Sequence, residues 1–105
     1  MLRDMCSSVA KILDLSPEFV WAFWLEIKEG EYYHPHWKTN KSNAPFVIIN
    51  CKSIYSDEKL TEVLKHLKET LSNSLNCEED KLLLGISKFN EKNLLVRNEI
   101  WDSKD

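Results

Sequence analysis

The sequence predicts an α/β (α+β) protein built as a tandem β-α-β repeat that lacks its first strand. One observation is the run Asn43–Cys51, which is short, apolar and rich in β-branched residues, as buried strands are. A helical apolar period follows and leads to a second apolar run, Leu82–Ile86, which completes one β-α-β unit. A constant spacing then relates this helix and strand to a similar pair at the start of the chain.

The start of the chain predicts a helix followed by a strand. Residues 2 to 14 have apolar side chains at helical spacing on one face: Leu2, Met5, Val9, Ile12 and Leu13. Pro17 ends this helix, because the residue before a proline disfavours helical dihedral angles. The run Phe19–Leu25 is β-prone and apolar on both faces, so we expect a strand covered on both sides by helices or by a neighbouring subunit.

The second half carries clearer boundary signals. Ser56 is a suitable N-cap for a helix that ends near Asn76. Its apolar stripe comprises Leu60, Val63, Leu64, Leu67, Leu71 and Leu75. We expect the next strand over about Lys81–Ser87 and a short last strand over Leu94–Arg97. The remaining residues form an acidic tail that Ile100 and Trp101 could anchor.

The repeat has an offset of 62 residues. Leu2 and Leu64 are 62 positions apart, and Val20 and Leu82 keep the same separation without a gap. The chain is therefore interpreted as one domain, 1–105, with repeat halves of about 1–42 and 43–105. The strand led by Pro45, moved back by 62, falls before Met1, so the first unit has lost its opening strand or the gene start has been placed too late. The alternative is that two leucine-rich stripes align by chance.

Composition excludes several classes of function. The net charge of −3 and the pI of about 5.6 give no basis for nucleic-acid binding. The apolar runs are far shorter than the roughly 20 residues that cross a bilayer, and no secretory signal is visible. Cys6, Cys51 and Cys77 form an odd set without CxxC spacing, which indicates reduced thiols in a cytoplasmic protein. No motif for a cofactor is present.

Three stretches resemble the tautomerase superfamily, which includes 4-oxalocrotonate tautomerase-like and macrophage migration inhibitory factor-like proteins. These stretches are Leu15–Trp21, Glu26–Tyr33 and Ala44–Ile49, and the likeness lies mainly in the layout of proline-led β-α-β units. The resemblance implies one four-stranded mixed sheet with two helices on one face, and a homotrimer whose sheets surround a central axis. It is closest to a small uncharacterised branch of the superfamily.

The family's chemistry depends on an N-terminal proline, whose amine removes a proton from a carbon next to a carbonyl. Here Met1 and Leu2 begin the chain, and Pro45 is internal, so its amide nitrogen has no usable lone pair. The resemblance therefore implies no catalytic residue in this sequence. Family members also hold substrate carboxylates with arginines, but neither Arg3 nor Arg97 falls in a motif that can be matched.

The candidate ligand-binding residues are Tyr33, His34, His36, Trp37 and Arg97. Imidazoles can bind ligands or metals and an indole can stack on a ligand. Two histidines supply only two ligands, however, so we expect no metal site and favour a surface or interface loop. Scattered cations, Lys38, Lys41, Lys52 and Arg97, could gather around an anion. Trp21, Phe23 and Trp24 are expected in the core or a trimer interface, and no basic partner for a catalytic thiol is apparent.

Three functions follow as hypotheses. The first is a homotrimeric module of the tautomerase superfamily that binds a small molecule or protein without the N-terminal proline. The second is an active tautomerase whose first strand and proline are missing from this sequence. The third is a ferredoxin-like α+β interaction domain, which a monomeric state would favour.

Overall fold

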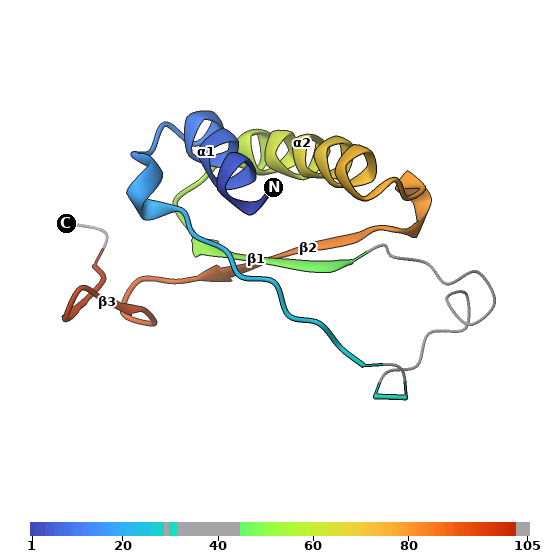
Figure 1. Cartoon of the computed structure of the whole chain (residues 1–105). Helices are drawn as coiled ribbons and strands as arrows, with labels where there is room; N and C mark the ends of the chain where they lie inside the picture. The colour runs from blue at the N-terminus through green and yellow to red at the C-terminus, as the bar shows by residue number, and fades with distance from the viewer. Residues whose placement is uncertain (29, 32–44, 103–105) are drawn as a thin grey trace.

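Two helices cover one face of a parallel pair of strands in the computed structural model (Figure 1). The structure describes residues 1–28, 30–31 and 45–102. The helices are α1, Leu2–Ile12, and α2, Asp57–Leu75, and each is followed by a single 3-10 turn, Pro17–Phe19 and Glu79–Lys81. The strands are β1, Phe46–Lys52; β2, Leu83–Phe89; β3, Leu95–Val96; and β4, Glu99–Ile100.

The predicted β1-α2-β2 unit is confirmed. Strands β1 and β2 pair in parallel from Phe46 opposite Leu83 to Lys52 opposite Phe89. Pro45 immediately precedes β1, outside the hydrogen-bonded ladder, where its missing N–H costs least. The Ser56 hydroxyl caps α2 by accepting a hydrogen bond from the backbone N–H of Lys59 at 3.2 Å.

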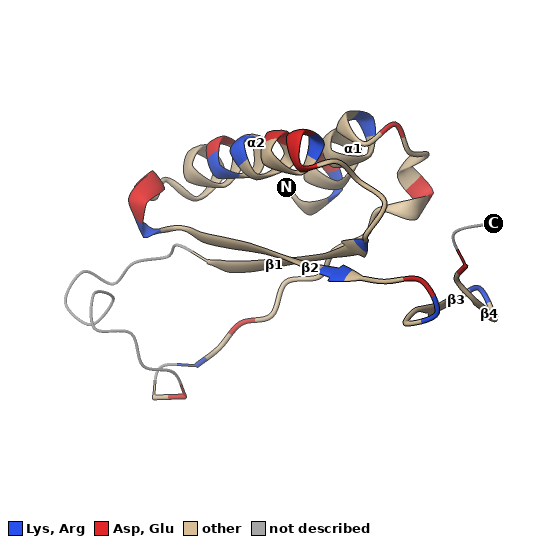
Figure 2. Cartoon of the chain, turned by 180° about the vertical axis from the view of Figure 1, so that it is seen from behind, with Lys and Arg blue, Asp and Glu red and all other residues tan. Residues whose placement is uncertain are grey.

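The core lies between the helices and the inner face of the sheet. Four buried side chains form its centre: Val9, Val63, Leu67 and Leu71. The β1 residues Val47 and Ile49 pack against them because alternate strand residues share one face. Positions with charged side chains occur along both helices, whereas β1 and β2 carry few of them (Figure 2). The predicted apolar stripes thus meet each other and the sheet, while charged side chains remain on the outer helical faces.

The two helices end in the same way, 62 residues apart. Asp14 and Asn76 both adopt left-handed dihedral angles, with φ of 57° and 51°. After each, a backbone N–H returns to the last helical turn, from Leu15 to the Ala10 carbonyl and from Cys77 to the Ser72 carbonyl. The 3-10 turns that follow share this offset. The helix exits therefore repeat in backbone geometry as well as in apolar pattern.

The segment after the first 3-10 turn departs from the prediction. We expected a strand over Phe19–Leu25, but Phe19 ends the turn and residues 20–28 are assigned to no helix or strand. The described strands form two separate two-stranded sheets, β1-β2 and β3-β4, so the four-stranded sheet is not observed. A β-prone sequence becomes a strand only with a hydrogen-bonding partner, and this segment has none among the described residues.

The expected core position of Trp21, Phe23 and Trp24 is wrong for the isolated chain. Their exposed fractions are 79%, 75% and 43%. Val20 packs against the core, so the alternate residues Trp21 and Phe23 fall on the opposite face, which nothing in the described chain covers. Whether these side chains form an interface between subunits stays a prediction.

The C-terminal residues form a hairpin anchored by one tryptophan. Strands β3 and β4 are antiparallel, and Arg97 and Asn98 between them both have positive φ, as a two-residue hairpin turn requires. Trp101 is buried, and its backbone N–H donates to the Leu94 carbonyl at 2.8 Å. The expected anchoring by Trp101 is confirmed, whereas Ile100 is exposed.

Candidate functional site

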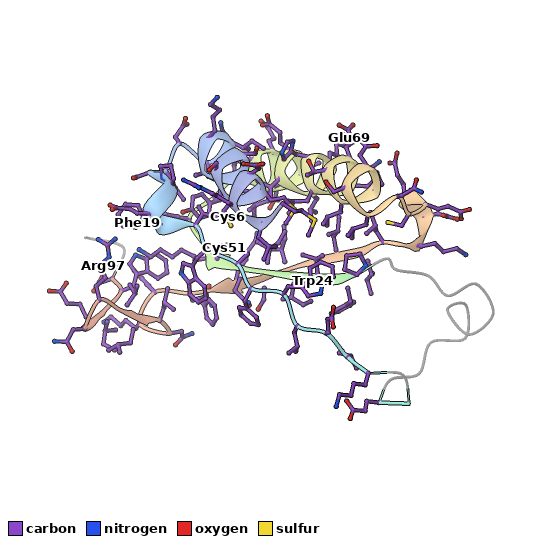
Figure 3. All side chains as sticks on the ribbon, viewed as in Figure 1. Cys6, Phe19, Trp24, Cys51, Glu69 and Arg97 are labelled. Atoms are coloured by element: carbon purple, nitrogen blue, oxygen red, sulfur yellow. The ribbon has the colours of Figure 1, made fainter. Side chains whose placement is uncertain are left out.

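Only one of the predicted ligand residues lies within the described chain. Tyr33, His34, His36 and Trp37 fall outside the described residues, so their grouping stays a prediction. Arg97 lies at the tip of the β3-β4 hairpin, and its guanidinium carbon is 4.2 Å from the centre of the Phe19 ring (Figure 3). This contact brings the hairpin to the turn that follows α1.

A second cation also lies over an aromatic ring. The Lys52 ammonium is 5.1 Å from the centre of the Trp101 ring, at the end of β1. Lys38 and Lys41 lie outside the described residues, so the gathering of these cations around an anion stays a prediction. Attraction to a ring face holds each cation in place without neutralising its charge, and a positioned cation can attract a carboxylate. The C-terminal hairpin therefore carries one positioned cation, Arg97, and the adjoining Trp101 positions another, Lys52.

Pro45 offers no amine base. It is half-buried and joined through an ordinary peptide bond to Ala44, ahead of β1. All three prolines of the sequence, Pro17, Pro35 and Pro45, are internal. Their nitrogens belong to tertiary amides, whose lone pairs are delocalised into the carbonyl.

Cys51 has a cationic neighbour that sequence reasoning missed. The parallel register places Cys51 opposite Lys88. Burial nevertheless raises the pKa of the Cys51 thiol, with the positive charge of Lys88 acting in the opposite sense. Burial also raises the pKa of Tyr55, and the nearby Cys51 adds to that increase. The Lys88 ammonium is committed to the Asp57 carboxylate at 3.3 Å, so this arrangement does not activate a thiolate nucleophile.

The outer surface between α1 and α2 contains an open groove of about 380 Å³. It is lined partly by Lys11, Lys65, Glu62 and His66, and the His66 Nε2 atom is 3.5 Å from the Thr70 hydroxyl. His66 lies on the charged side of the α2 sequence, where the sequence alone predicts a solvated side chain. The sequence shows that each helix has a polar face, and His66 lies on one of them. Only the packing of the two helices shows that these polar faces meet in a groove. Mixed charges in an open groove select no ligand class.

The described residues include neither a candidate metal site nor a candidate membrane-spanning helix. No group of three or more His, Cys, Asp and Glu side chains is arranged there to hold a metal ion. His34 and His36 are outside that search, so the expectation of no metal site at their loop stays a prediction. None of the described helices combines the length and apolar character needed to cross a membrane.

Comparisons with known proteins now identify the fold. No protein-family model matches the sequence, and no curated protein matches it. Among solved structures, native fused 4-OT superposes with a TM-score of 0.79 at 11% identity, over 94% of this chain and 80% of that one. N1, a member of the cis-3-chloroacrylic acid dehalogenase family, gives a TM-score of 0.75 at 10% identity, over 96% of this chain and 71% of that one.

A third structure matches only part of the chain. YwhB, a homologue of 4-oxalocrotonate tautomerase, superposes with a TM-score of 0.50 at 16% identity, over 53% of this chain and 92% of that one. About half of this chain thus corresponds to nearly all of that protein, while the fused 4-OT structure matches almost the full length. Identities this low establish architecture alone. The chain has the fold of the 4-oxalocrotonate tautomerase family, as the resemblance in its sequence implies.

Proposed function

We propose that this protein is a tautomerase-superfamily binding module that assembles as a homotrimer and binds a small carboxylate without N-terminal-proline catalysis. The observation that carries the proposal is the fold match to fused 4-OT across 94% of a chain whose three prolines are all internal. The fold supports the family, and Pro17, Pro35 and Pro45 supply no amine base, because their nitrogens are tertiary amides. The four-stranded mixed sheet would then arise only when the missing strand is supplied.

The proposed ligand site combines Arg97 with the aromatic and histidine residues Tyr33, His34, His36 and Trp37. A guanidinium can bind a carboxylate through two parallel hydrogen bonds. Stacking on Phe19 limits the orientations of Arg97, which lowers the entropy lost when a ligand is bound. A carboxylate ligand is favoured because two cations, Lys52 and Arg97, are held over aromatic rings at this end of the molecule.

The proposed trimer draws support from apolar side chains on the outer face of the sheet. Phe46, Ile48 and Leu83 are 56%, 48% and 56% exposed on the side away from the helices. Exposed apolar patches of this kind commonly mark interaction surfaces. Sedimentation equilibrium tests assembly directly: a mass of three chains supports the proposal, whereas a monomer at all accessible concentrations contradicts it and favours the ferredoxin-like interaction domain.

Ligand binding is tested with an enolisable keto acid and a matched alcohol that lacks the carboxylate. We expect the acid alone to bind, measured by calorimetry, and we expect Arg97→Ala to weaken binding by roughly ten- to a hundredfold, the loss of a charge-assisted hydrogen bond. Lys92→Ala, on the turn before the same hairpin, is the matched control. Equal affinity for the acid and the alcohol would refute the carboxylate site.

The alternative is an active tautomerase whose first strand and proline lie upstream of Met1. The 62-residue repeat favours it, because the equivalent of β1 falls before Met1. Two observations would support this alternative. The first is an in-frame Met-Pro upstream of Met1 that is followed by a β-prone run. The second is that the protein lengthened by these residues catalyses proton exchange at the α-carbon of the keto acid. If the lengthened protein catalyses no proton exchange, the alternative is excluded.

A further inference from the structure

Residues Trp21–Ile27, here called the acceptor segment, form an extended chain whose backbone pairs with no other described residue (Figure 1). The hydrogen bonds nearest to it in sequence flank it, from the Val20 N–H to Pro17 and from the Glu31 N–H to Lys28. Within the part of the chain that the structure describes, no residue of the segment makes a hydrogen bond. Unpaired extended backbone is a template for the addition of another strand.

All seven side chains of the acceptor segment are exposed, and all except Glu26 are apolar. Trp21, Phe23, Leu25 and Ile27 are exposed by 79%, 75%, 73% and 57%. At about 200 Å² for each large side chain, these four and Trp24, which is 43% exposed, present roughly 650 Å² of apolar surface. A stable interface between two proteins needs about 800 Å² from each partner. The exposed area of this segment therefore fits a single peptide strand better than a whole second copy of the chain.

The lack of charged side chains in most of the acceptor segment limits which partner strands can bind to it. The run from Val20 to Leu25 contains no charged side chain, and charges begin only at Glu26 and Lys28. An occupant with charged residues opposite the uncharged run would lose hydration without gaining a partner. The segment consequently selects a strand that is uncharged and apolar along its middle.

The repeated helix exits indicate the direction of the occupant. After α2, the chain leaves through the left-handed residue Asn76 and a 3-10 turn, and then forms β2 in parallel with β1. After α1, the same exit leads through Asp14 into the acceptor segment, which runs opposite to β1 in Figure 1. We propose that the acceptor segment binds an uncharged apolar β-strand supplied by another polypeptide, with the bound strand parallel to the acceptor segment as β1 is to β2. This proposal uses none of the residues of the proposed carboxylate site.

The test uses the full chain and a synthetic peptide with the sequence of residues 45–51, in which Cys51 is replaced by Ser to prevent disulfide exchange. This peptide is the strand that pairs with β2 in the same geometry. Hydrogen exchange is followed at individual amides. We expect saturating peptide to slow exchange at alternate residues of the acceptor segment by at least about tenfold, as new backbone hydrogen bonds form. The same peptide carrying Ile48→Pro is the control and should protect less.

Paired proline variants of the protein locate the edge that is used. Phe23→Pro with Leu25→Pro removes two N–H donors from one edge, and Ala22→Pro with Trp24→Pro removes two from the other. We expect one pair to weaken peptide binding by about tenfold or more and the other by less than about threefold. Unchanged amide protection in α2 shows that each variant is folded.

Three results would overturn the proposal. They are no protection of the acceptor segment at millimolar peptide, an equal loss of binding in both proline pairs, and protection that rises with protein concentration in the absence of peptide. The last result would assign the segment to contact between copies of this chain. Because assembly and keto-acid binding are measured separately, none of these outcomes decides the proposed function.

Discussion

Leu71 gives the most direct test of the core. It is 1% exposed and belongs to the buried cluster with Val9, Val63 and Leu67, so Leu71→Ala removes three carbon atoms from the centre of the α1-α2 contact. Core Leu→Ala substitutions cost about 2–5 kcal/mol, because lost burial is added to the cost of the remaining cavity. We expect about 3 kcal/mol, a large part of the 5–15 kcal/mol by which small domains are stable.

Urea denaturation followed by circular dichroism measures this loss. A slope of about 1.5 kcal/mol/M for a chain of this size converts 3 kcal/mol into a fall of roughly 2 M in the midpoint. The control is Leu95→Ala, on the hairpin strand β3, where 63% exposure predicts a loss below about 1 kcal/mol. Protein concentration is held fixed, because assembly would add to the apparent stability. Equal losses in the two variants would refute the assignment of the core.

Three further predictions concern the ends of α2 and the β1-β2 register. Ser56→Ala removes the cap and should cost about 1 kcal/mol in urea denaturation. Asn76→Gly should raise the thermal midpoint and Asn76→Ala should lower it, because the left-handed backbone at φ 51° favours glycine and penalises alanine by about 1 kcal/mol. The raised pKa of Cys51 favours the protonated thiol in the folded state, so its contribution to stability is present at low pH and is lost as pH rises through the folded pKa. The rate of Cys51 alkylation, measured by peptide mass spectrometry from pH 7 to about pH 10, reports on this pKa. We expect alkylation to be slow at neutral pH. It should be slower still in Lys88→Gln, because the Lys88 charge lowers the Cys51 pKa.

The second β-α-β unit could be predicted from sequence because its signals are local. The apolar run at Phe46, the cap at Ser56 and the leucine stripe of α2 each depend on neighbours within a few positions. Hydrophobic period and capping are the most reliable of such signals. The hairpin turn was missed, because Arg97-Asn98 lacks the glycine that usually marks a two-residue turn.

The candidate site was less predictable because its contacts are not local. Arg97 could be named as a cation, but its position over Phe19 depends on how the hairpin folds back towards the turn after α1. The same limit applies to Cys51 and Lys88, which are brought together only by the register of two strands that a helix separates in sequence. A list of chemically capable residues can be taken from sequence, whereas their grouping requires the fold.

The contrast between the two repeats shows what makes a strand in this protein. Both helices end in a left-handed residue, the same returning hydrogen bond and a 3-10 turn, and both exits lead into β-prone residues. Leu83–Phe89 becomes β2 because β1 precedes α2 and supplies its partner. Trp21–Ile27 is equally apolar but has no partner in the described chain, so it stays extended and exposed. The local sequence therefore permits the strand, and a hydrogen-bonded neighbour decides whether it forms.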